Sequence, residues 1–175
     1  MNKSLLCFLS MKNWFKYVLS LLVCLLLGHA NGQNLSDLSP FRIVTPSASF
    51  YELSKIGTGT PVLIIYFSPE CDDCRSLTKA LILHRNKWNK TKIIMVTNSS
   101  LDQLKRFERD FKLKGISNLV CGTEGKQMAL QRHYLIKQFP FAGIFDWKGR
   151  LIKIYREIKT PGDWLQEVSL LQTMK

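Results

Sequence analysis

Two strongly apolar segments stand out along the chain, at residues 61–67 and at residues 92–97, where Lys92 and Thr97 flank four apolar residues. The first has the sequence PVLIIYF and the second KIIMVT, so both are rich in β-branched and aromatic residues. A continuous apolar run is typical of a parallel strand buried on both faces, whereas strict alternation is typical of a half-buried strand. The pattern therefore predicts two central strands of one sheet.

Apolar residues at helical spacing alternate with the strand-like runs. Leu104, Phe107 and Phe111, for example, recur on one helical face behind the capping segment Asn98–Ser100. We expect strands at residues 41–44, 61–67, 92–97, 118–121, 142–146 and 151–157. We expect helices at residues 47–56, 72–88, 98–115 and 126–136, and a last helix that begins near residues 160–163. This alternation predicts an α/β domain with helices on both faces of one sheet.

The first 32 residues differ from the rest of the chain. They contain three lysines and no acidic residue, then an uncharged run from Tyr17 to Gly28, then small residues at Ala30 and Gly32. A basic start, an apolar middle and a small-residue cleavage site are typical of a secretory signal peptide. We therefore expect a signal peptide at 1–32, an N-terminal arm at 33–40 and one domain at 41–175.

Other interpretations of the leader are weaker. An uncleaved leader that tethers the protein to a membrane is disfavoured, because the run of 12 residues is short of the about 20 that a spanning helix needs. Lipidation at Cys24 is disfavoured because this cysteine lies in the middle of the run and follows Val23. Translation could also start at Met11, because residues 11–16 form a sufficient basic segment by themselves.

The chain is strongly basic, with 25 Lys and Arg against 13 Asp and Glu and a formal net charge of +12. Removal of the leader takes three lysines away and leaves a charge of about +9 on the mature chain. Such an excess fits either an anionic partner or a solvated basic surface, and we favour the surface. Export argues against nucleic acid as a partner.

A cysteine pair occupies the predicted junction between the first buried strand and the helix that follows it. Cys71 would cap the helix, where unpaired backbone N–H groups favour an anion such as a thiolate. Cys74 lies one turn further and would face inward, close enough to form a disulfide with Cys71. Cys71 would attack a substrate disulfide, and Cys74 would resolve the mixed disulfide.

Two alternatives for this pair stay open. A pair with this spacing is also half of a common zinc site, but the mature chain adds only Cys121, His84 and His133, none of them in paired spacing. We therefore expect no metal. The pair could also form a structural disulfide without turnover. Cys121 is expected to be a small buried hydrophobic residue.

Two segments resemble thioredoxin-like proteins. Residues 66–74, with the sequence YFSPECDDC, resemble the active-site segment, and residues 134–149 resemble the segment in which a helix leads into a cis-proline, an apolar strand and a glycine turn. By this resemblance Pro140 is the cis-proline and Phe139 contacts the substrate. The resemblance covers residues 41–175 and is closest to extracytoplasmic TlpA/ResA-type thiol:disulfide oxidoreductases, with Lys114–Thr123 as their short insert.

The resemblance implies a thioredoxin fold, in which helices flank both faces of a central mixed sheet. It implies no cofactor beyond a redox-active disulfide between Cys71 and Cys74. It also implies protein disulfides as substrates, a membrane or soluble thiol as electron donor, a monomer, and a location in the bacterial periplasm or at another extracytoplasmic face.

Several residues depart from the thioredoxin pattern. The acid six residues before the first cysteine is replaced by Ile65, so a proton relay of that type is absent. The usual threonine or valine before the cis-proline is Phe139. Glu70, Asp72 and Asp73 surround the cysteines, and their charge makes a nearby thiolate less favourable, which we expect to tune the pair toward a reductase.

Two competing functions remain. The chain could be a non-catalytic thioredoxin-like binding module with a structural Cys71–Cys74 disulfide, or a basic protein that binds anionic surfaces. A peroxiredoxin is disfavoured because its Pro-x-x-x-Thr-x-x-Cys pattern is missing.

Overall fold

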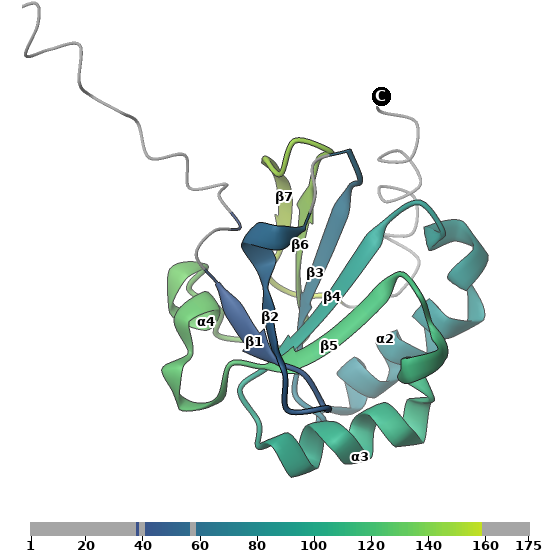
Figure 1. The fold of residues 1–175 in the computed structure, drawn as a ribbon, viewed down its shortest axis with the longest axis vertical. Helices are drawn as coiled ribbons and strands as arrows, with labels where there is room; N and C mark the ends of the chain where they lie inside the picture. The colour runs from purple at the N-terminus through teal and green to yellow at the C-terminus, as the bar shows by residue number, and fades with distance from the viewer. Residues whose placement is uncertain (1–37, 39–40, 57–58, 159–175) are drawn as a thin grey trace, which may run out of the picture. The chain divides into compact units, whose positions relative to one another are not determined.

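A seven-stranded mixed sheet organises the part of the chain that the computed structural model describes, which is Leu38 and residues 41–56 and 59–158 (Figure 1). The strand order is β2-β1-β5-β4-β3-β6-β7. The strands are β1 (Arg42–Val44), β2 (Phe50–Glu52), β3 (Val62–Tyr66), β4 (Lys92–Thr97), β5 (Leu119–Thr123), β6 (Phe141–Phe145) and β7 (Leu151–Tyr155). The α-helices are α2 (Asp72–Leu83), α3 (Leu101–Phe111) and α4 (Ala129–His133). The expected signal peptide and the expected last helix lie outside the described residues.

The two apolar runs form the centre of the sheet, as predicted. β3 and β4 pair in parallel, and every residue of β3 is buried. β5 continues the parallel arrangement on the far side of β4, whereas β6 pairs antiparallel with β3 and β7 antiparallel with β6. The predicted hairpin at the end of the domain is therefore present as β6 and β7.

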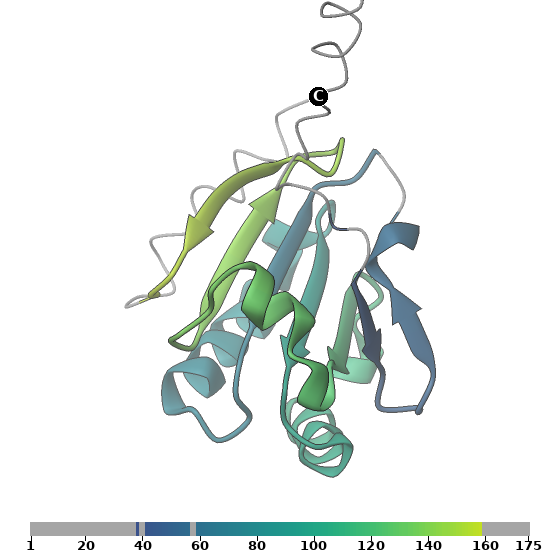
Figure 2. The same ribbon diagram turned by 90° about the vertical axis from the view of Figure 1, so that its left-hand side faces the viewer.

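Helices cover both faces of this sheet. Figure 2 shows α4 crossing one face while α2 lies behind the other. The alternation along β3 explains the two layers, since Leu63 and Ile65 join the cluster that contains Leu77 of α2, while Ile64 and Tyr66 join the cluster on the α4 side. Burial on both faces is the physical reason for the uninterrupted apolar run.

The prediction of a helix at residues 47–56 is wrong. This segment forms a tight turn, then β2, which pairs antiparallel with β1, and then a 3₁₀ turn at Leu53–Lys55. The turn is closed by a hydrogen bond from the Thr45 N–H to the Ser49 carbonyl (2.9 Å), and the hydroxyls of Thr45, Ser47 and Ser49 bond to one another. Serine and threonine side chains that bond locally compete with helix formation, and here they stabilise the turn.

Three other expected helices are shorter than predicted. α2 ends at Leu83 and is followed by a 3₁₀ turn at Arg85–Trp88, and α3 ends at Phe111, with a 3₁₀ turn at Leu113–Gly115. The segment 126–136 holds only a 3₁₀ turn at Gly125–Gln127 and the short α4. Met128 and Leu135 have left-handed φ angles of 43° and 52°, which interrupt and end that helix.

The capping segment before α3 is confirmed in detail. The Ser100 side chain accepts a hydrogen bond from the Gln103 N–H, and the Gln103 side chain accepts one from the Ser100 N–H. This reciprocal pair is a capping box, which satisfies two backbone donors that the helix itself cannot. The segment expected as an insert, Lys114–Thr123, supplies β5, which lies inside the sheet between β4 and β1.

Candidate active site

Cys71 lies where the sequence predicts it, at the N-cap of α2 just beyond the end of β3. Its backbone is extended (φ −83°, ψ 121°), and its Sγ accepts a hydrogen bond from the Cys74 N–H at 3.2 Å. The side chain is half-buried and so keeps some contact with solvent. The free N–H groups of a helix start favour negative charge on a group held in this position.

Cys74 lies one turn further along α2 and faces the core. It is 1% exposed and packs in the cluster that holds Leu77 and Phe67. Burial raises the pKa of the Cys74 thiol, and its hydrogen bond with Cys71 and the charge of Asp73 act in the same direction. Cys74 is therefore a thiol at neutral pH, and both cysteines are free thiols in the structure.

The segment around Pro140 meets the cysteine pair in space. The peptide bond between Phe139 and Pro140 is cis. The Cys71 thiol donates a hydrogen bond to the Phe139 carbonyl oxygen at 3.8 Å. A hollow of about 310 Å³ opens beside this contact. It is lined by Cys71, Asp73, Lys137, Gln138, Phe139, Pro140, Glu157 and Ile158.

The aromatic residues near the site fall into two groups, those buried in the core and one that lines the hollow. Tyr66, Phe67 and Phe141 are buried in the core, whereas Phe139 is part-exposed and lines the hollow. The ring of Phe139 stacks on that of Tyr66, with centroids 5.7 Å apart and planes at 22°. Phe139 therefore contacts the core residue Tyr66 through its ring and Cys71 through its carbonyl oxygen.

The three acids expected to tune the pair are all exposed, but they are placed differently. Asp73 lines the hollow beside Cys71, while Glu70 and Asp72 are outside that lining. Asp72 and Asp73 both lie in the first turn of α2. Ile65, which replaces the buried acid of thioredoxin, is fully buried among apolar residues.

Sequence reasoning missed some residues of the site. Lys137, Glu157 and Ile158 also line the hollow. Lys137 lies in the segment 134–149 but was not singled out, and nothing in the local sequence marks Glu157 and Ile158, because only the fold brings them to the hollow. Glu124 was also missed. It follows β5 directly and is only 9% exposed, but it lies three residues beyond the strand expected at 118–121, so no local signal identified it.

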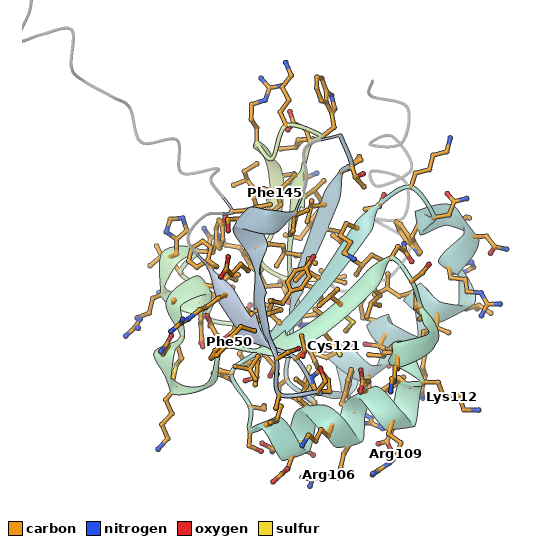
Figure 3. All side chains as sticks on the ribbon, in the orientation of Figure 1. Phe50, Arg106, Arg109, Lys112, Cys121 and Phe145 are labelled. Carbon is orange, nitrogen blue, oxygen red and sulfur yellow. The ribbon has the colours of Figure 1, made fainter. Side chains whose placement is uncertain are left out.

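Cys121 and the two candidate histidines lie apart from this hollow. Cys121 is a buried residue of β5, and its Sγ lies 3.9 Å from Oε1 of Glu108 in α3. Figure 3 shows Cys121 beside that helix. Burial and the neighbouring Glu108 raise the pKa of this thiol to about 12. The ring of His133 packs edge-on against Phe41, and His84 is the C-cap residue of α2.

Within the described part of the chain, no group of three His, Cys, Asp or Glu side chains is placed to hold a metal ion. Among the same residues no helix has the length and apolar character that crossing a bilayer requires.

Comparisons with known proteins identify the fold. No protein-family profile and no curated protein matches the sequence. Solved structures do match. DsbF of Mycobacterium tuberculosis has a TM-score of 0.65 at 12% identity, covering 78% of this chain and 97% of that one. A secreted disulfide oxidoreductase of Mycobacterium tuberculosis, homologous to DsbE of E. coli, has a TM-score of 0.62 at 12% identity, covering 82% and 99%.

These matches show that the chain has the thioredoxin fold, as the sequence resemblance predicted. The peroxidoxin BcpB of Mycobacterium tuberculosis has a TM-score of 0.64 at 9% identity, covering 77% of this chain and 93% of that one. Proteins with different names therefore share this fold, so the fold by itself does not determine the function.

Proposed function

We propose that this thioredoxin-fold protein is an exported thiol:disulfide oxidoreductase, with Cys71 as nucleophile and Cys74 as resolving cysteine. The observation that carries the proposal is the pairing of a part-exposed thiol at a helix start with a buried thiol one turn further. The first thiol borders an open hollow, so a substrate can reach it. The second is shielded from every partner except the first.

The chemistry proceeds in two exchanges. The Cys71 thiolate attacks one sulfur of a substrate disulfide, a mixed disulfide forms, and the leaving sulfur takes up a proton. Cys74 then loses its proton and attacks the Cys71 sulfur, which releases the second substrate thiol and leaves a Cys71–Cys74 disulfide. Two electrons pass from the protein to the substrate, and a thiol donor must return them.

The surroundings of the pair favour reduction over oxidation. A strongly oxidising pair stabilises its thiolate, whereas Asp73, Asp72 and Glu70 place negative charge near Cys71. In this proposal Phe139 and Pro140 form the substrate-binding wall, because they line the hollow next to the reactive sulfur.

The location and partners follow from the leader and the chemistry. A cleaved leader would deliver the protein to the periplasm or another extracytoplasmic face, where disulfides are stable enough to be substrates. A membrane-bound or soluble thiol donor would regenerate the dithiol, and we expect the protein to act as a monomer in cell redox homeostasis. Disulfide exchange of this kind needs no cofactor.

Cysteine variants test the proposal directly. The reduced protein should cleave insulin disulfides, Cys71→Ser should abolish this activity, and Cys74→Ser should accumulate a mixed disulfide that gel electrophoresis without reductant detects. Cys121→Ser is the matched control, because it removes a buried thiol away from the hollow, and it should retain activity. Undiminished turnover by Cys71→Ser would rule out the mechanism.

The reduction potential separates a reductase from the alternatives. A value near that of thioredoxin, about −270 mV, supports a reductase, and one near about −120 mV supports an oxidase. A non-catalytic module with a structural disulfide predicts a bond below about −300 mV that resists mild dithiol. The open hollow at Cys71 favours turnover over this second candidate.

A further inference from the structure

Phe139 contacts different parts of the fold through its backbone and through its ring. Its carbonyl oxygen accepts the Cys71 thiol hydrogen bond, and its ring stacks on Tyr66. The residue packs against the apolar clusters on both sides of the sheet. A shift of the ring on Tyr66 would therefore move the carbonyl relative to the reactive sulfur.

Tyr66 is itself held by a buried polar contact. The side chain is fully buried, and its hydroxyl donates a hydrogen bond to Glu124 Oε1 at 2.6 Å. Burial first, and then the hydrogen bond and charge of Glu124, raise the pKa of Tyr66, so the hydroxyl remains a donor. A buried hydrogen bond with both partners satisfied fixes the ring more firmly than apolar packing alone.

The Glu124 carboxyl also holds the start of the helix that leads toward Phe139. Its Oε2 accepts the Leu130 N–H at 2.7 Å, and its Oε1 accepts the Gln131 N–H at 3.2 Å. The Gln131 side chain in turn donates to the Ile136 carbonyl at 3.3 Å. One carboxyl group is thus connected to Phe139 by two routes, through the ring of Tyr66 and through α4.

The geometry points to Tyr66 and Glu124 as positioning residues that hold the Phe139 backbone beside Cys71 for exchange with protein disulfides. This inference rests on the proposed function. The main chain on either side of a protein disulfide must lie along the wall that Phe139 forms, because that wall borders the Cys71 sulfur that attacks the disulfide. A small disulfide reaches Cys71 without that contact, and so its reaction should not depend on the wall.

Two disulfides of different size test the inference. We would measure the rate constants of reduced wild type, Tyr66→Phe and Glu124→Gln with insulin and with the small aromatic disulfide dithionitrobenzoate. Tyr66→Phe keeps the stacked ring and removes only the hydroxyl. Both variants should lose about tenfold on insulin, since misplacement by a fraction of an ångström at a reacting group has effects of this order. Both should keep their rate with the small disulfide.

The control and the double variant make the result specific. Tyr134→Phe removes another buried tyrosine hydroxyl from the same side of the sheet, and it should change neither rate. Tyr66→Phe/Glu124→Gln should lose no more on insulin than Glu124→Gln alone, because the Glu124 carboxyl serves both routes to Phe139 and the Tyr66 hydroxyl serves only one of them. Partial unfolding would lower both rates together, so the ratio of the two rates is independent of stability.

Each other outcome overturns the inference. Equal losses on insulin and the small disulfide, no loss on insulin, or losses that multiply in the double variant would all show that this hydrogen bond does not position the wall. Failure of the proposed function looks different, because wild type itself would then leave insulin intact.

Discussion

The Sγ atom of Cys71 lies 3.8 Å from the carbonyl oxygen of Phe139, although 68 residues separate them along the chain. The pairing of β3 with β6 explains this proximity. The strands are antiparallel, and Tyr66 at the end of β3 is paired with Phe141 at the start of β6. The segment that leaves β3 toward Cys71 therefore meets the segment that enters β6 through Phe139.

The difference in environment between the three cysteines predicts an order of reactivity. Cys71 is half-buried beside the hollow, whereas Cys74 is 1% and Cys121 4% exposed. Burial raises the pKa of both inner thiols, and the thiol form does not react with alkylating agents. Brief iodoacetamide treatment of the reduced protein at pH 7.5 should modify Cys71 at least about tenfold faster than the other two. Peptide mapping by mass spectrometry measures this, and comparable rates at Cys71 and Cys74 would contradict the assignment of roles.

Much of the fold could be predicted because its central elements carry unambiguous local signals. The run at 61–67 is apolar throughout, and the run at 92–97 is apolar at its four central positions, so their identity as buried strands does not depend on distant contacts. The position of Cys71 followed from the same signal, because a helix must start soon after such a strand. Ser100 and Gln103 likewise form their capping box within four residues of chain.

The errors arose where local signals were ambiguous or the decisive contact was distant. The apolar residue Phe50 is compatible with one face of a helix as well as with a strand, and the pairing of β2 with β1 stabilises the strand. α4 is short because Met128 and Leu135 adopt left-handed conformations that no local pattern indicates for these residue types. The hydrogen bond between Tyr66 and Glu124 spans 58 residues and has no local signature at all.

The buried thiol of Cys121 should make the reduced protein less stable at alkaline pH. Its folded pKa is raised to about 12, against about 8.5 for an unfolded cysteine, so the folded state keeps a proton that the unfolded state loses. The stabilisation is complete below about pH 8.5 and is lost progressively as the pH rises from there toward 12. Relative to Cys121→Ser, wild type should lose about 1.4 kcal/mol of unfolding free energy per pH unit between pH 9 and 11.

Urea unfolding under reducing conditions, repeated across this range, measures the effect of Cys121. Cys74 and Tyr66 also have raised pKa values, and they contribute equally in the two proteins, so the difference between the curves isolates Cys121. Parallel curves from pH 7 to 11 would show that Cys121 is not shielded in the folded state.

Asp146 should stabilise the hairpin of β6 and β7 through its charge as well as its hydrogen bonds. Its Oδ1 accepts the N–H groups of Lys148 and Arg150, and its Oδ2 lies 2.7 Å from the Arg150 guanidinium. Burial opposes ionisation, but the hydrogen bonds from Arg150 and Lys148 outweigh it and lower the pKa of Asp146. The contribution of the Asp146 charge to the free energy of unfolding is therefore present above about pH 3.9 and is lost as the pH falls below that.

Two substitutions separate these contributions of Asp146. Asp146→Ala should cost about 1–3 kcal/mol, because two part-buried hydrogen bonds from backbone N–H groups are lost, while Asp146→Asn keeps the acceptor and should cost less. Asp110→Asn, at an exposed acid of α3, is the control and should change stability by less than about 0.5 kcal/mol. Thermal unfolding at pH 7 and pH 3 tests this, and equal costs of Asp146→Ala at both pH values would refute the role of the charge.

Gly122 in β5 should be indispensable for the packing of β1. A Cβ atom at this position would lie 2.6 Å from Cδ1 and 2.9 Å from Cβ of Ile43, a residue that is 1% exposed. Gly122→Ala should therefore cost about 1–3 kcal/mol of unfolding free energy, the usual cost of overpacking. Gly115→Ala is the matched control, because nothing lies within 4 Å of its added methyl group.

The cost of Gly122→Ala should shrink in an Ile43→Ala background, because the two side chains compete for one space. Both strands lie on the side of β4 away from β6, so folded Gly122→Ala should reduce insulin at the wild-type rate. Urea unfolding of the four variants measures the coupling, and an undiminished cost in the Ile43→Ala background would show that the glycine is required for another reason.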